Sequence, residues 1–320
     1  MKVILVFLVL IQSWTIQSQN KADYTNYHKN IIDAEALIAS EKYNEALIEL
    51  TKTIEGYDFV FLKDIKIATQ LAVFLNNDAK AFKFLELGIK SGWTLKEIKK
   101  NKLLTSLRGK SQWSVIIKSY PEFQKVFENR IDKSLKSRVK EMYKKDQKMA
   151  WSYLFRIGQT AKEKYANKKV KPHAIEQIDI LNRIIDDKGY PGEKLIGEPV
   201  WMSTILSHHN SVSEDFVKTD TLYDNLRPKL LTAIRGGELN PYEFALMEDW
   251  RITIKHDRQK PGFGYIESLK PEQVSASNEL RKQIGIRSVE LRNNLVAIEE
   301  KTGMDFYLAG SGWVDGKIGL

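Results

Sequence analysis

Residues 43–55, YNEALIELTKTIE, and residues 78–90, DAKAFKFLELGIK, carry the same apolar pattern 35 residues apart. Both stretches place apolar side chains three or four positions apart, which is typical of an amphipathic helix with one buried face. The matching positions are Ala46, Leu47, Leu50 and Ile54 in the first stretch and Ala81, Phe82, Leu85 and Ile89 in the second. A period near this length with two helices per unit predicts an array of helical hairpins over residues 24–91.

The segment before residue 43 supplies the first helix of the first hairpin. Its apolar face comprises Tyr27, Ile31, Ala34 and Ile38. The spacing Ala36–x6–Tyr43–x2–Ala46 resembles the tetratricopeptide repeat, in which small residues let two helices approach and an aromatic ring fills the gap. The second unit has Asp78 where the first has Tyr43, and neither unit ends in the usual proline. The resemblance implies a concave surface for another protein; a plain helical bundle is the alternative.

The first eighteen residues differ from the rest of the chain. Lys2 precedes an apolar run over residues 3–11, and polar or small residues follow as far as Ser18. This order predicts a secretory signal over residues 1–18, cleaved after Ser18, although a buried first helix would have a similar composition. The run is shorter than the roughly 20 residues that span a bilayer. We therefore expect an exported protein, periplasmic or secreted, without a transmembrane segment.

The composition excludes several classes of chemistry. The chain has 320 residues, of which 42% are hydrophobic and 28% charged, and it has no cysteine. This composition is typical of a soluble globular protein, and it excludes disulfides, thiolate metal ligands and a cysteine nucleophile. The net charge of +9 is concentrated in residues 90–148. A basic surface attracts acidic partners, anionic lipid or nucleic acid, but export argues against nucleic acid, and a solvated helix face is the simpler interpretation.

Helical periodicity continues through the rest of the chain. We expect further helices over residues 119–142, 175–185, 200–209, 222–235, 241–256 and 277–300. Ser119–x2–Glu122 has the pattern of a capping box at the start of the first of these. The sequence thus predicts a mostly α fold, with N-terminal helical-hairpin repeats over residues 19–135 and a helical C-terminal domain over residues 136–320. The glycine-rich tail after residue 303 is expected to form a loose strand or an ordered flap.

Several short motifs follow one another between residues 140 and 290. They are Asp146–Gln147, Asp179–x2–Asn182, Gly189–Tyr190–Pro191, Ser207–His208–His209–Asn210, Ala245–x3–Asp249, Gln259 to Gly264, and Arg281–x2–Ile284–Gly285. Their order and spacing resemble a family known only as a domain of unknown function. The resemblance implies no activity, but it singles out a set of polar positions.

These candidate binding residues are Asp146, Gln147, Asp179, Asn182, His208 and Asp249. Short polar side chains on apolar helices are costly to bury unless they are paired. They therefore form either one internal network that fixes helix packing or the lining of one pocket, with His208 as a base that Asp249 orients. The first arrangement predicts an exported binding or scaffolding protein without identifiable catalytic activity. The second predicts an envelope hydrolase.

Familiar catalytic and metal-binding motifs are absent from the sequence. There is no H-E-x-x-H or G-x-S-x-G, and Gly310–Ser311–Gly312 lacks the lysine of a phosphate loop. His208 and His209 are adjacent, so on a helix their side chains point about 100° apart, which disfavours joint ligation of one metal ion. A zinc site built from His208, Asp249 and another carboxylate is the remaining alternative. We expect no cofactor and no metal, and a protein partner bound through the helical repeats.

Overall fold

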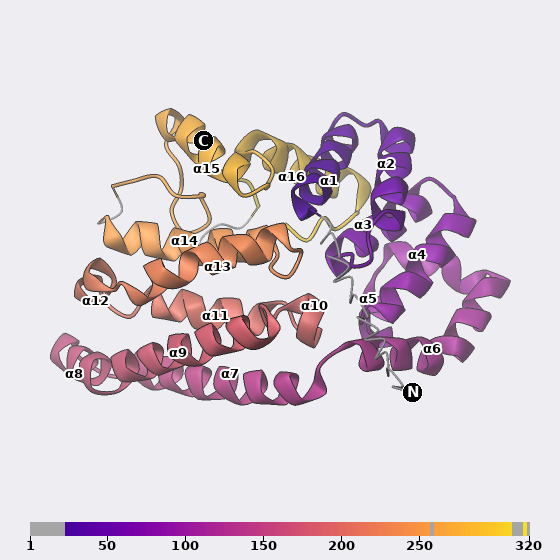
Figure 1. Cartoon of the computed structure of the whole chain (residues 1–320). Coiled ribbons are helices and arrows are strands. Elements are labelled where there is room, and N and C mark those ends of the chain that lie inside the picture. Colours follow the sequence, from indigo (N-terminus) through magenta and orange to yellow (C-terminus); the bar gives the residue numbers. More distant parts are fainter. Residues whose placement is uncertain (1–22, 257–258, 309–315, 319–320) are drawn as a thin grey trace, which may run out of the picture.

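The computed structural model describes residues 23–256, 259–308 and 316–318. Over these ranges the chain folds into sixteen α-helices, with short 3₁₀ and π segments and no β-strand. The predicted fold class is confirmed: N-terminal helical hairpins are followed by a helical C-terminal part (Figure 1). None of the helices in these ranges is long and apolar enough to cross a membrane. The predicted signal, residues 1–18, lies outside the described residues.

Two successive hairpins form the N-terminal array. The helices are α1 (Tyr24–Ala39), α2 (Tyr43–Glu55), α3 (Leu62–Phe74) and α4 (Asp78–Lys90), and α1 packs on α2 as α3 packs on α4. All eight positions of the repeated apolar pattern are buried. Tyr43 packs edge-on against Phe74, with ring centroids 5.0 Å apart. The pattern at 35-residue spacing therefore marks the faces that join the two hairpins into one core.

The array closes with α5 (Leu95–Lys100), the 3₁₀ segment η1 (Leu103–Gly109) and α6 (Ser111–Arg130). The bounds predicted for a helix over residues 119–142 are wrong. Helix α6 starts earlier, and the helical structure is interrupted between α6 and α7 (Lys133–Leu154). Pro121 lies inside α6, so Ser119–x2–Glu122 does not start a helix. The start of α7 is set by Asp132, whose Oδ1 accepts a hydrogen bond from the Leu135 N–H at 2.8 Å. An aspartate in this position satisfies an N–H that the helix itself leaves free.

The C-terminal helices surround a second core. They are α8 (Gln159–Tyr165), α9 (Lys171–Lys188), α10 (Glu193–Ile196), α11 (Val200–His209), α12 (Glu214–Thr219), α13 (Leu222–Arg235) and α14 (Pro241–Lys255), with the π segment η2 (Ala166–Val170) between α8 and α9. The bounds of α11 and α13 agree with the sequence prediction, and α9 ends at Gly189, which has a φ of 91°. Val139, Leu181, Leu206 and Leu230 are among the side chains of this core.

The last helices connect the two cores. After the 3₁₀ segment η3 (Pro271–Gln273), α15 (Val274–Gln283) and α16 (Val289–Thr302) replace the single helix expected over residues 277–300, since Gly285 breaks it with a φ of 74°. Helix α16 packs against α1, and its Leu295 and Ile298 belong to the core of the hairpin array. Part of the predicted domain 136–320 thus completes the core of the hairpin array.

Candidate functional site

The structure separates the six polar residues singled out from the sequence. Asp146 on α7 and His208 on α11 form a pair, with 2.6 Å between Oδ2 and Nδ1. Gln147 lies beside this pair, with its Nε2 donating to Asp146 at 3.4 Å. The other three residues, Asp179, Asn182 and Asp249, contact neither member of the pair by any hydrogen bond among the described residues. The six residues therefore do not form one network.

Asp249 has a structural position inside the second core. Its carboxylate accepts hydrogen bonds from the backbone N–H groups of Phe263 at 2.6 Å, Tyr265 at 2.5 Å and Ile266 at 3.0 Å. Gly262 approaches so closely that a Cβ there would lie 1.8 Å from Asp249 Oδ1. Burial raises the pKa of Asp249, and the three amides oppose that shift. Both Asp249 oxygens bind this loop and His208 pairs with Asp146, so the alternative in which Asp249 orients His208 is wrong.

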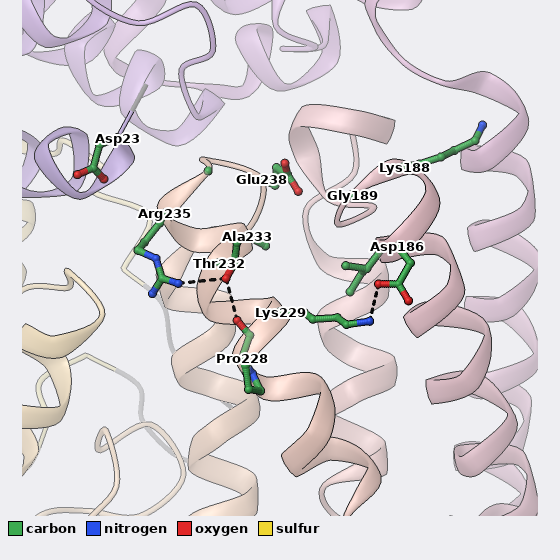
Figure 2. A pocket seen from close by; sticks show the side chains of 12 residues that line it. Asp23, Asp186, Lys188, Gly189, Pro228, Lys229, Thr232, Ala233, Arg235 and Glu238 are labelled. Carbon is green, nitrogen blue, oxygen red and sulfur yellow. Dashed lines mark hydrogen bonds and ion pairs between the residues drawn. The ribbon is translucent and has the colours of Figure 1, made fainter. Parts of the chain in front are cut away.

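Asp179 and Asn182 lie on the surface of α9. The side chain of Asp179 is exposed, and Asn182 Oδ1 accepts a hydrogen bond from Lys229 Nζ at 2.7 Å. Lys229 also pairs with Asp186 at the edge of an open depression of about 750 Å³ between α9 and α13 (Figure 2). Other charged residues that line the depression also have hydrogen-bond partners. Glu238 accepts a hydrogen bond from the Tyr190 N–H at 3.0 Å, and Lys188 donates to Asp132, which lies outside the depression, at 2.6 Å. We interpret it as a solvated surface of paired charges.

A more enclosed cavity lies where the hairpin array meets the second core. This junction pocket has a volume of about 650 Å³. Its polar and aromatic lining includes Lys63, Lys66, Glu193, Ser203, Ser207, His208, Tyr242, Glu243, Trp250 and Tyr307. Helix α3 thus forms one wall, and α10, α11 and α14 contribute the others. Apolar walls with a few convergent polar groups are typical of a small-molecule site.

His208 lines the junction pocket and is paired behind with Asp146. Its side chain is 36% exposed, whereas the Asp146 carboxylate behind it is 8% exposed. Because His208 Nδ1 is hydrogen-bonded to Asp146, a ligand would contact His208 through Nε2. A buried carboxylate in this position fixes the tautomer and orientation of an imidazole.

Two carboxyl groups in the pocket have raised pKa values. Glu193 is buried at the start of α10, and burial raises its pKa to about 7, although its Oε1 accepts the Leu62 N–H at 2.6 Å. Burial also raises the pKa of Glu243 well above its usual range, and the neighbouring Glu193 charge adds to this shift. Glu243 Oε2 is buried with no hydrogen-bond partner among the described residues. Burial therefore favours the protonated form of Glu243, and a hydrogen bond with the Ser203 side chain opposes the shift.

The hairpin wall of the pocket carries two lysines. Lys63 Nζ lies 4.3 Å from the centroid of the Tyr242 ring and 3.5 Å from Asp64 Oδ1. Lys66 Nζ lies 5.2 Å from the centroid of the Tyr307 ring. Cations on one wall and carboxyl groups with raised pKa values on the other suit a ligand with both hydroxyl and acidic groups.

The sequence did not point to Glu193 or Glu243. Each acid lies in the first turn of a helix, where glutamates are common because they interact favourably with the helix dipole. A glutamate in such a position is usually solvated, so no signal in the sequence distinguished Glu193 and Glu243 from exposed glutamates. Their burial depends on the approach of α3 to α10 and α14.

The neighbouring His209 belongs to a buried structural network. It is 1% exposed, and its Nε2 lies 3.0 Å from Asp220 Oδ2. Arg251 Nη1 donates to the same Asp220 oxygen at 3.3 Å. Within the described ranges no three His, Asp or Glu side chains are grouped as metal ligands. The zinc alternative is also disfavoured by the engagement of both Asp249 oxygens with backbone amides.

No protein-family model, curated protein or solved structure matches the chain. The two resemblances noted in the sequence therefore stay predictions, and function is inferred from the geometry of the junction pocket.

Proposed function

We propose that the chain is an exported helical binding protein that holds a small polar ligand in the junction pocket. The observation that carries this proposal is Glu243, which lines a cavity of about 650 Å³ and whose buried Oε2 has no hydrogen-bond partner among the described residues. An unsatisfied buried oxygen costs about 1–3 kcal/mol. A ligand group that bonds to it would recover this free energy.

The other lining groups support the same class of ligand. Glu243 offers a carboxyl group whose protonated form is favoured, and Glu193 offers a carboxyl group with a pKa of about 7; Lys63 offers a cation, and Tyr242 and Trp250 offer flat apolar surfaces. Hydroxyl-rich molecules that carry an acidic group, such as sugar acids, match this combination. Export and a protein partner on the hairpin array are further parts of the proposal, supported by the sequence alone.

Thermal unfolding in the presence of sugars, sugar acids and amino acids tests the proposal. A ligand at a hundred times its Kd stabilises the folded state by about 2.7 kcal/mol, which raises the Tm by several degrees. Glu243→Ala and Lys63→Ala should each weaken its binding about tenfold. Lys229→Ala is the matched control, because Lys229 lines the separate surface depression. A ligand that binds both pocket variants as tightly as the parent would contradict the proposal.

A hydrolase is the second candidate, favoured by the 2.6 Å contact between His208 Nδ1 and Asp146. In this mechanism His208 Nε2 would accept a proton from water, Asp146 would stabilise the imidazolium, and protonated Glu243 would protonate the leaving group.

Chromogenic esters, glycosides and phosphoesters distinguish the two functions. For a hydrolase, we expect turnover by the parent that falls about 10²–10⁴-fold in His208→Ala. For a binding protein, we expect no turnover by the parent. The ligand identified by thermal unfolding should then bind His208→Ala with at most a modest loss of affinity.

A further inference from the structure

A cluster of apolar side chains is exposed at the C-terminal end of α7. Its members are Trp151, Leu154, Phe155 and Ile157, which are 57%, 61%, 76% and 94% exposed. We name this cluster the α7 tip. The Trp151 and Phe155 rings stack with centroids 5.9 Å apart. Single exposed apolar residues are normal on a protein surface, but a contiguous group of large ones marks an interaction site.

The α7 tip projects beyond the second core. The buried residues of α7 are Leu135, Val139, Met142 and Asp146, so no residue of its last two turns is buried. Helix α8 follows the tip at the end of α7 that lies far from the hairpin array (Figure 1). The tip can therefore contact a flat surface without obstruction from the array.

Basic residues flank the α7 tip in the sequence. Residues 144–171 contain nine lysines and arginines but only two acidic residues, Asp146 and Glu163. Asp146 is buried against His208, so it does not offset the surface charge. The cations include Arg156, which lies 4.6 Å from the Tyr165 ring. On α12, Glu214 is paired with Lys218.

We propose that the α7 tip inserts into the surface of an anionic lipid bilayer. Trp, Phe, Leu and Ile side chains partition into the boundary between headgroups and acyl chains, while the long basic side chains keep their charges among the headgroups. Each lysine or arginine near an anionic membrane strengthens binding about fivefold. A protein partner would need a large acidic surface around an apolar groove, whereas an anionic membrane offers both features at once. The inference is independent of the junction pocket.

Cosedimentation of the full chain with vesicles tests the proposal. The parent should bind vesicles of equal parts phosphatidylcholine and phosphatidylglycerol much more strongly than vesicles of phosphatidylcholine alone, and salt should weaken binding. Phe155→Ser combined with Ile157→Ser should weaken binding more than about tenfold, because two apolar anchors are lost. Ile48→Ser combined with Val115→Ser is the control, since both of these side chains are 63% exposed but lie away from the tip.

A site-specific probe separates the α7 tip from any contribution of residues 1–18. The chain has no cysteine, so Gln159→Cys and Ser106→Cys each offer one thiol for an environment-sensitive dye. The dye beside the tip at position 159 should shift to the blue on anionic vesicles, and the dye at position 106 should not. No shift at position 159, or equal vesicle binding by the parent and the Phe155→Ser, Ile157→Ser variant, would overturn the proposal. A dimer that this variant abolishes would assign the tip to a second copy of the chain, which would also overturn it.

Discussion

The Asp249 carboxylate accepts three backbone N–H groups inside the second core. Asp249→Ala should therefore lower the free energy of unfolding by at least about 3 kcal/mol, because each buried N–H left without an acceptor costs about 1–3 kcal/mol. Asp179→Ala is the matched control: its side chain is exposed, and we expect a change within about 0.5 kcal/mol. Urea unfolding of both variants beside the parent measures the two effects. Similar losses in both would show that the Asp249 contacts have been misassigned.

Glu193 links the stability of the protein to pH. Its pKa of about 7 in the folded state exceeds the ordinary value of 4.5, so the folded state binds more protons than the unfolded state between these values. The contribution of Glu193 to stability is therefore fully present below about pH 4.5 and is lost as the pH rises to about 7. At about 1.4 kcal/mol per pKa unit, the loss amounts to about 3 kcal/mol. Glu193→Gln cannot ionise, so it should be more stable than the parent at pH 8 and should show a smaller decline from pH 5. Parallel pH profiles for both proteins would contradict the assignment.

At the scale of the element, Asp132 determines where α7 begins. It accepts the Leu135 N–H at 2.8 Å and pairs with Lys188 Nζ at 2.6 Å. Asp132→Ala should cost about 0.5–2 kcal/mol, as loss of a helix N-cap does, whereas Asp132→Asn keeps the acceptor and should cost less. Urea midpoints distinguish the two variants. Equal losses would mean that the ion pair with Lys188, rather than the N-cap, stabilises this start.

At the scale of the whole molecule, a buried ion pair joins α1 to the segment between α15 and α16. Arg287 Nε donates to Glu35 Oε2 at 2.7 Å, and both side chains are 1% exposed. Glu35→Ala leaves a buried charge unpaired, so it should lower stability by about 3–5 kcal/mol. Adding Arg287→Met to Glu35→Leu removes both charges and should recover most of this loss.

Calorimetry measures this coupling directly. Because α16 contributes Leu295 and Ile298 to the array core, we expect the parent to unfold in one transition. Two separate transitions, with only one shifted by Glu35→Ala, would show that the cores unfold independently.

The helices themselves could be predicted from the sequence because their signals are local. Apolar side chains three and four positions apart share a helix face wherever the helix lies, so the hairpins and the bounds of α11 and α13 followed from neighbouring residues. The break before α7 was missed because both Ser119–x2–Glu122 and Asp132 have the chemistry of a helix start. Only packing decided between them: Asp132 also donates its N–H to the Leu195 carbonyl at 2.9 Å.

The sequence by itself therefore determined a mostly α chain of amphipathic helices, including its hairpins, since the hairpin helices and the longer helices that follow repeat their apolar residues at helical spacing. The tertiary structure decided which polar groups meet. Asp146 pairs with His208 across 62 positions, Glu193 with Leu62 across 131, and Arg287 with Glu35 across 252. No local pattern encodes such pairs, because their distance depends on how whole helices pack. The same packing buries Glu193 and raises its pKa, so the junction pocket and its chemistry belong to the folded molecule alone.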